Sequence, residues 1–483
     1  MNLPELGVGL NWFPELDPVL KANKDLVNVL EVEPQSLWRR DKGSDSLVLD
    51  PASVEATRLY QLPTLVHSVA LPVGGTLAPP EVEAAHLAAT SQQLSSPWVS
   101  EHLSFNRVRD ESGEWQSGLL LPPCHTIAGV EAAVASVRAL AASQSVPLAI
   151  ETGVNYLRPR KGELPDGEFV ARVADEADCG ILLDLHNIWT NQRNGRQALA
   201  DYVEQIPLER VWEIHLAGGH YHRGFWLDAH SAVAPPELME LATRIVPRLP
   251  NLKAIIFELF PAYLPRISPA AFRAQLEALH RLWARRNTAS SIKAKRRGAA
   301  PIGAHPSPSE WERTLAKLAV HKPCVSPLAE EMRKDPGLAV IREMVEKFRG
   351  SMVVRTLRLS SRLIMLERGP AYLEQLLAEF WKTHAPQPFA LDEASAFASF
   401  LREQKPYVPF LPEVLAYDCA VLAVALDGEE RCVPFGADPL PLLRALGAGR
   451  RPTEVARGQY EIRLTPDLVE AEVRALSVMD VIH

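Results

Sequence analysis

Short apolar runs recur eight times in the first 260 residues of the chain. Most are nearly continuous stretches of Val, Ile and Leu, the pattern of parallel strands that are covered on both faces. We interpret these runs as strands at 6–12, 27–33, 63–69, 99–105, 146–153, 180–187, 211–218 and 252–260.

The segments between these runs have the spacing of amphipathic helices. Examples lie at 79–94, 128–144, 235–249 and 268–286, and the last two begin with Pro or Ser, which favour a helix start. Eight strands alternating with helices over about 285 residues predict an α/β fold, a (β/α)8 TIM-like barrel. An open doubly wound sheet is the alternative, but it usually carries a glycine-rich dinucleotide loop, and the sequence shows none.

The composition and the hydrophobic pattern of the chain change after residue 286. Residues 287–309 contain small residues, prolines and the basic run KAKRR (293–297), which is typical of an exposed linker. Helical patterns dominate from residue 310, and two short segments, 430–435 and 459–465, have the composition of strands. We therefore expect a barrel domain over 1–286, a linker over 287–309 and a mostly helical domain with a small β-containing tail over 310–483.

Composition narrows the class of protein. The 483 residues are 47% hydrophobic and 23% charged, which is ordinary for globular proteins. No apolar run is long enough to span a bilayer and no signal peptide is visible, so we expect a soluble cytoplasmic protein without a membrane partner. The net charge of −8 does not favour nucleic acid as a partner. Five widely spaced cysteines without a CxxC motif argue against a disulfide framework or a thiolate zinc site.

Polar residues stand at the carboxyl ends of nearly all the predicted strands. In a (β/α)8 barrel these ends converge on one face, where active sites lie. Buried carboxylates and imidazoles are costly unless they are paired or bound to metal. Histidine, carboxylate and amide donors without cysteine suit iron, manganese or zinc, and there are more of them than one ion needs. The donors are His67, Glu101, His102, Glu151, Asp184, His186, Asn187, His215, Asp228, His230 and Glu258.

Seven segments carry a family resemblance: LVHSVAL, SEHLSF, AIETGVN, LLDLHNIW, EIHLAGGH, DAH and FELF. In this order, over about residues 5–285, they resemble the multinuclear non-heme iron-dependent oxidative enzymes, long called domain of unknown function 692. The resemblance implies a barrel that holds two or three iron ions and uses dioxygen to modify a ribosomally made peptide, often at cysteine. The iron ligands that it implies are His67, His102, Glu151, Asp184, Asn187, His215, Asp228, His230 and Glu258.

Two stretches depart from the family pattern. The family commonly shows an acidic residue followed by paired amides, whereas this chain has Asp184-Leu185-His186-Asn187. The glutamate that usually begins an ENV-like stretch is followed here by Thr152-Gly153. These departures leave the number of irons and the reaction outcome open. We expect His186, His220 and Tyr156 to position the substrate or protons.

The C-terminal region resembles the helical partner proteins that accompany these enzymes, most clearly in PYVPFLPEVLAYD (406–418). The resemblance implies a fusion of catalyst and partner, in which residues 310–483 replace or dock a partner protein and hold the precursor peptide. A fusion makes docking intramolecular and raises its effective concentration. The strand at 459–465 could accept a peptide as an added strand. A purely stabilising helical domain is the alternative.

Three hypotheses for function follow from these patterns. The first is an iron- and dioxygen-dependent oxidoreductase that modifies a ribosomally made, cysteine-containing peptide. The second is a divalent-metal-dependent isomerase or hydrolase of the sugar isomerase and endonuclease barrel type, which would act without oxygen. The third is a non-catalytic binder of metal or peptide. The match of whole strand-end motifs favours the first.

Overall fold

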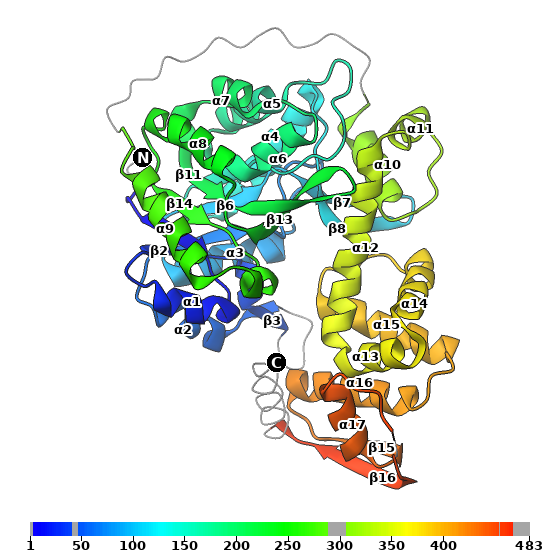
Figure 1. Cartoon of the computed structure of the whole chain (residues 1–483). Helices are drawn as coiled ribbons and strands as arrows, with labels where there is room; N and C mark the ends of the chain where they lie inside the picture. Colours follow the sequence, from blue (N-terminus) through cyan, green and yellow to red (C-terminus); the bar gives the residue numbers. More distant parts are fainter. Residues whose placement is uncertain (1–2, 41–46, 288–305, 454, 467–483) are drawn as a thin grey trace.

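The computed structural model describes residues 3–40, 47–287, 306–453 and 455–466. Eight parallel strands form a closed barrel in the order β1-β14-β11-β10-β9-β6-β5-β2 (Figure 1). These strands are β1 (Gly7–Asn11), β2 (Val29–Val32), β5 (Thr64–Ser68), β6 (Val99–His102), β9 (Leu148–Glu151), β10 (Gly180–Asp184), β11 (Val211–Leu216) and β14 (Ala254–Phe257). Each lies within one of the eight apolar runs, so the predicted barrel is confirmed.

Helices surround the barrel in the order that a βα repeat requires (Figure 1). They are α1 (Asp17–Ala22), α2 (Pro51–Arg58), α3 (Glu81–Leu94), α4 (Ile127–Ser143), α5 (Asp166–Ala177), α6 (Leu185–Arg193), α7 (Leu199–Gln205), α8 (Pro236–Ile245) and α9 (Pro269–Trp283). Short 3-10 turns cover Pro14–Leu16, Pro34–Leu37, Leu208–Arg210, Val246–Arg248 and Pro261–Arg266.

Three hairpins depart from the simple repeat. They are β3 (Trp38–Arg40) with β4 (Leu47–Leu49), β7 (Phe105–Asp110) with β8 (Gly113–Leu121), and β12 (Gly218–His222) with β13 (Phe225–Ala232). Each is a two-stranded sheet separate from the barrel. The sequence did not indicate them because their residues mix polar and apolar types, and β13 is half-buried along its whole length.

Side chains alternate between the two surfaces of the barrel wall. Residues such as Leu30, Val66, Ile150 and Ile255 belong to the large apolar core that contains the helices. Residues of the opposite parity face the barrel interior, and the N-terminal half of that interior is mostly apolar. We call this the lower layer: Val29, Leu65, Trp98, Ala149, Ala254 and Ile256.

The C-terminal region is mostly helical with a small β-containing tail, as predicted. It consists of α10 (Pro308–Ala319), α11 (Pro327–Met332), α12 (Pro336–Thr356), α13 (Arg358–Arg368), α14 (Pro370–Thr383), α15 (Ala390–Gln404), α16 (Leu411–Asp427), β15 (Arg431–Ala437), α17 (Pro439–Gly447) and β16 (Arg457–Leu464). No helix among the described residues is long and apolar enough to cross a membrane.

Two apolar cores divide this region. The residues from Val353 onward form a core of their own, whereas α10, α11 and the first half of α12 share a core with β7, β8 and Tyr156 of the barrel domain. Helix α12 therefore belongs to both cores (Figure 1). Most of the expected linker, including 293–297, lies outside the described residues. The division at 287–309 stays a prediction.

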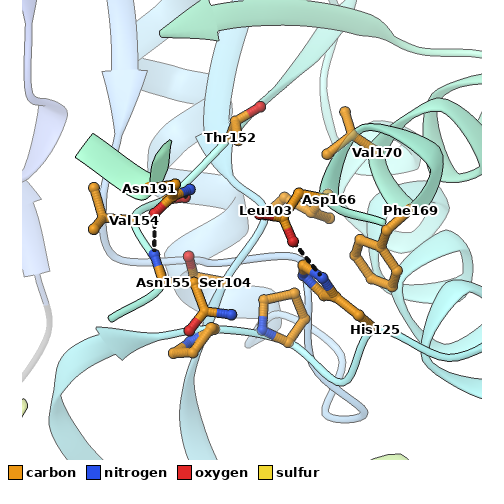
Figure 2. A pocket seen from close by; sticks show the side chains of 13 residues that line it. Leu103, Ser104, His125, Thr152, Val154, Asn155, Asp166, Phe169, Val170 and Asn191 are labelled. Atoms are coloured by element: carbon orange, nitrogen blue, oxygen red, sulfur yellow. Dashed lines mark hydrogen bonds and ion pairs between the residues drawn. The ribbon is translucent and has the colours of Figure 1, made fainter. Parts of the chain in front are cut away.

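A small cavity of about 20 Å³ opens beside the carboxyl ends of β6 and β9 (Figure 2). Leu103 and Ser104, which follow β6, line it together with Thr152 and Gly153, which follow β9. A cavity of this size has room for about one water molecule. It lies directly beside the residues that the sequence predicts to bind metal.

Candidate metal centre

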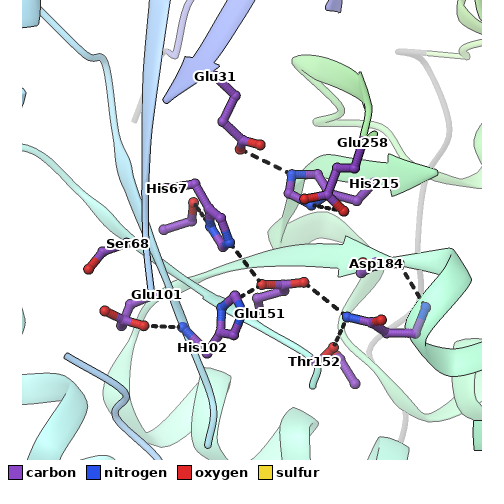
Figure 3. Close-up of polar contacts among 12 residues, drawn as sticks. Glu31, His67, Ser68, Glu101, His102, Glu151, Thr152, Asp184, His215 and Glu258 are labelled. Atoms are coloured by element: carbon purple, nitrogen blue, oxygen red, sulfur yellow. Dashed lines mark hydrogen bonds and ion pairs between the residues drawn. The ribbon is translucent and has the colours of Figure 1, made fainter. Parts of the chain in front are cut away.

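The first group of predicted ligands meets around one carboxylate oxygen. Glu151 Oε2 lies 2.7 Å from His102 Nδ1 and 3.2 Å from His67 Nε2 (Figure 3). Neither Glu151 Oε2 nor His102 Nδ1 has a hydrogen-bond partner, although both are buried. Ligand atoms bound to one ion at about 2.1 Å lie roughly 3 Å apart. The spacing is therefore that of donors arranged around a cation.

The pKa shifts of His102 and Glu151 agree with this arrangement. Burial alone would lower the pKa of His102, but Glu151 and Glu101 outweigh it and raise the pKa to about 9. Burial would raise the pKa of Glu151, yet His102 and His67 bring it well below its usual value. In the metal-free chain, protonated imidazole supplies positive charge to a buried carboxylate. A metal ion would displace that proton and take over its role.

A second group centres on His215, which is completely buried. Its Nε2 donates to Glu31 Oε2 at 3.1 Å, while its Nδ1 faces Glu258 Oε2 at 3.2 Å without a hydrogen bond (Figure 3). A metal-binding histidine usually donates its other ring N–H to a carboxylate, which fixes its tautomer. Glu31 fits that supporting role, which leaves His215 Nδ1 and Glu258 to face the metal.

Asp184 and Asn187 lie where β10 turns into α6. Asp184 Oδ1 accepts the backbone N–H of Asn187 at 2.8 Å and so caps the helix. The other oxygen, Oδ2, is buried without a partner, and a carboxylate oxygen of Asp184 lies within 4.8 Å of donor atoms of Glu151 and His215. The Asn187 amide donates to Glu151 Oε1 at 3.2 Å, and its own oxygen has no partner. Both side chains thus offer a free oxygen at the centre.

The last pair of predicted ligands comes from the β12–β13 hairpin. His230 Nε2 lies 2.9 Å from Asp228 Oδ1 and 3.5 Å from Glu258 Oε2. Both ring nitrogens of His230 are buried without a hydrogen-bond partner. Its backbone adopts a left-handed φ of 43°, which is uncommon for a residue other than glycine and is typical of functional sites. Burial opposes charge on His230, but Asp228 and Glu258 raise its pKa to about 10.

His186 supports this pair. Its Nε2 accepts the indole N–H of Trp226 at 3.2 Å, and its Nδ1 lies 2.9 Å from Asp228 Oδ1. Because indole only donates, the neutral ring carries its proton on Nδ1 and donates it to Asp228. His186 therefore contacts Asp228 directly, and His186, Asp228 and His230 lie close enough together to form a further group of possible metal ligands.

The other two residues predicted to assist catalysis lie apart from the facing donors. His220 is exposed on β12, with Nδ1 3.1 Å from Ser231 Oγ. Tyr156 is buried, and its hydroxyl accepts the backbone N–H of Asp228 at 3.2 Å. This contact is to the ligand-bearing hairpin and not to the centre itself.

Three carboxylates near the centre were not among the predicted ligands. Glu31 and Glu213 are buried inside the barrel, and Glu213 accepts the indole N–H of Trp98 at 2.9 Å. Burial raises the pKa of Glu33 to about 7, and the charge of Glu258 adds to this effect. The sequence did indicate a role for these residues, because a carboxylate within an apolar strand is energetically costly unless it has a partner.

A separate acidic group surrounds His125 at the cavity. Its Nδ1 lies 3.2 Å from Asp166 Oδ1 (Figure 2), and Glu163 is close to both. The buried guanidinium of Arg196 already pairs with Asp166 at 2.5 Å and with Glu163 at 2.8 Å. This group has its cation within the chain, so it differs from the barrel centre, where no Lys or Arg of the described part of the chain is paired with the facing donors.

The geometry defines a parallel barrel with a cluster of histidine and carboxylate donors at the carboxyl ends of its strands. Residues 7–262 match the family model described as RiPP precursor modification enzyme MbnB/TglH/ChrH. The chain belongs to this family, which confirms the resemblance drawn from the sequence.

Individual relatives are distant. A UPF0276 protein of Streptomyces avermitilis is 27% identical over 250 residues, which cover 51% of this chain and only 50% of that protein. A UPF0276 protein of Anaeromyxobacter is 30% identical over 40% of this chain and 68% of its own length. Endonuclease IV from Thermus thermophilus aligns with 58% of this chain and 99% of its own at 18% identity, with a TM-score of 0.37. A TM-score at this level carries no functional argument.

Proposed function

We propose that this chain is an iron- and dioxygen-dependent oxidoreductase that modifies a ribosomally made precursor peptide at cysteine. Family membership supports the precursor peptide as substrate. The observation that carries the metal is the set of buried donor atoms that face one another at 2.7–3.5 Å without hydrogen bonds. In the metal-free chain protonated imidazoles supply the positive charge that these carboxylates need, and a bound cation would take over that role.

The donors fit more than one ion. His67, His102 and Glu151 form one group of possible ligands, and Glu151 also belongs to a second group with Asp184 and His215. A carboxylate shared in this way suits a bridging role. Histidine and carboxylate donors suit iron, although manganese and zinc accept the same set. When bound, iron would supply the oxidising chemistry and would hold a substrate thiolate.

The chain's own residues shape access to this centre. Leu103 and Thr152, each one residue beyond a candidate ligand, line the small cavity beside the donors. Glu101 points away from the cluster (Figure 3) and accepts the backbone N–H groups of Leu71 and His102. Glu101 thereby fixes the loop after β5, while the apolar lower layer closes the other end of the barrel to water.

Peptide capture is assigned to the C-terminal domain as part of this proposal. Strand β16 pairs only with β15 within the described residues, and most of its side chains are exposed. An unpaired edge offers backbone N–H and C=O groups to an extended peptide. Because the domain is covalently attached to the barrel, a captured leader would deliver the modifiable segment at high effective concentration.

The test uses the full chain, loaded with ferrous iron without oxygen, and a cysteine-bearing candidate peptide encoded near its gene. We expect a change in peptide mass only after oxygen is admitted, and no change with a Cys→Ser peptide. Zinc-loaded protein is the matched control and should be inactive. Oxygen-independent turnover of a sugar or phosphodiester with zinc or manganese would contradict the proposal and favour the isomerase or hydrolase hypothesis.

A further inference from the structure

The N-terminal end of α12 meets the barrel at the segment that follows Glu151. Asp335 caps α12 through Oδ1, which accepts the N–H of Gly337 at 2.8 Å. Its other oxygen, Oδ2, accepts the N–H of Arg158 at 2.8 Å. One carboxylate therefore fixes the start of the helix and the position of the barrel loop at the same time.

Gly337 allows this loop to approach closely. A Cβ at residue 337 would lie 2.0 Å from the carbonyl oxygen of Tyr156, so no larger residue fits without a shift of the backbone. The Tyr156 hydroxyl in turn accepts the N–H of Asp228 at 3.2 Å. A continuous chain of contacts thus runs from α12 through Tyr156 to a residue beside the metal centre.

Helix α12 touches the same hairpin a second time. Glu343 Oε2 lies 3.0 Å from His222 Nε2 and 3.3 Å from Arg223 Nε, at the turn between β12 and β13. Phe225 and Leu227 of β13 also pack against the core that contains the first half of α12. The hairpin is therefore held by charge and by apolar contact with the C-terminal domain.

The hairpin needs such support because, among the described residues, its strands pair only with each other. The other predicted ligands stand on or directly beside barrel strands, whose ladders fix them. Asp228 and His230 depend instead on what contacts β12 and β13. On the side of α6, Asn194 exchanges two hydrogen bonds with the backbone of Trp226, at 2.8 and 2.9 Å. Helix α12 supports the other side.

We propose that α12 positions Asp228 and His230 through Tyr156 and Glu343, so that the C-terminal domain completes the metal centre. This inference rests on the metal centre of the proposed function. Tyr156 and Glu343 are positioning residues, because they act through the hairpin and not on the metal.

The test compares metal uptake by full-length variants. Tyr156→Phe removes the hydroxyl that accepts the N–H of Asp228, and Glu343→Gln removes the negative charge beside His222 and Arg223. The double variant leaves every predicted ligand in place. Glu331→Gln is the matched control, because it breaks the Arg160–Glu331 pair between the same two parts of the chain, away from the hairpin. Each protein is loaded anaerobically with ferrous iron, and bound iron is measured by titration and Mössbauer spectroscopy.

We expect the double variant to bind its weakest iron about 10- to 100-fold less tightly, the usual effect of losing groups that orient metal ligands. The remaining iron, the circular dichroism and the binding by the control should match those of the wild type. Unchanged iron affinity and spectra in a folded double variant would overturn this inference and leave the proposed function standing. A wild-type chain that takes up no metal would overturn both.

Discussion

The two ends of the barrel interior are built on the same strands and the same side-chain face, yet they differ completely in chemistry. Two residues further along each strand, the lower layer gives way to an upper layer of polar groups: Val29 to Glu31, Leu65 to His67, Ala149 to Glu151 and Ile256 to Glu258. The lower layer is packed hydrocarbon apart from Glu213, which is in register with Ala254 and accepts the indole N–H of Trp98. The upper layer has facing donor atoms that the chain itself does not satisfy. One end serves stability, and the other is arranged for a cation.

Buried carboxylates elsewhere in the chain do receive hydrogen bonds from neighbouring groups. Both oxygens of Glu101 accept backbone N–H groups. Glu312, on α10, accepts the N–H of Thr76 at 2.8 Å and its hydroxyl at 2.5 Å. Glu151, Asp184 and Glu258 each keep one buried oxygen without a donor. This contrast points to bound metal more sharply than the mere presence of acidic residues.

The largest effect should follow from a change in the upper layer. Glu151→Gln removes the charge shared by His67 and His102 and keeps the size of the side chain. We expect loss of at least one bound iron per chain, measured by metal analysis after anaerobic loading. The metal-free variant should unfold at a lower temperature than the metal-free wild type, because protonated His102 loses the carboxylate that compensates its buried charge. Full iron content in the variant would show that the charge of Glu151 is not needed to hold iron, and would contradict the contrast drawn between the two layers.

The opposite pattern is expected in the lower layer. Ile256 is completely buried, and Ile256→Ala leaves a cavity that should cost about 2–5 kcal/mol of the free energy of unfolding. Urea denaturation measures this loss. Iron content per folded chain should stay at the wild-type value, and a matching loss of iron would show that the two layers are not separable.

The next prediction concerns Glu312 on α10, a buried carboxyl group that accepts hydrogen bonds from Thr76. Burial raises its pKa from 4.5 to about 7, although Thr76 opposes the shift. The folded state thus binds more protons than the unfolded state between these values, so this contribution to stability is full below pH 4.5 and is lost as pH rises towards 7. At about 1.4 kcal/mol per pH unit, the whole loss is about 3 kcal/mol at most.

Comparison of the wild type with Glu312→Gln isolates this contribution. The free energy of unfolding of the wild type, relative to that of the variant, should fall between pH 5 and pH 7 and then level off. Chemical denaturation at each pH provides the measurement. A constant difference over this range would show that Glu312 does not titrate as its burial predicts.

The smallest effect is expected at the surface. Arg160 and Glu331 form a pair with two contacts of 2.9 Å, but the Glu331 side chain is 55% exposed. Glu331→Gln should change the free energy of unfolding by about 1 kcal/mol or less, with less effect at high salt. A loss above about 2 kcal/mol at this exposed site would weaken the distinction between surface pairs and the buried centre.

Much of the barrel could be predicted because its strands are covered on both faces and read as continuous apolar runs. The gathering of polar side chains could be predicted because barrel strands end on one face, which brings the ring centroids of His67 and His215 to 5.3 Å despite their separation in sequence. Glu31 could not be assigned, because alternation alone does not say which face of a strand looks inward. The β12–β13 hairpin was not predicted, because its half-buried residues show neither the two-residue period of a strand nor the 3.6-residue period of a helix clearly. The contacts of His186 with this hairpin could therefore not be predicted either.

The central claim is that the upper layer holds more than one iron, and metal analysis with Mössbauer spectroscopy tests it most directly. The protein should be purified without added metal and compared with His215→Ala, which removes a completely buried nitrogen donor. We predict two or more coupled irons per chain, with fewer in the variant. Stoichiometric zinc or manganese that persists after anaerobic iron loading would contradict the account.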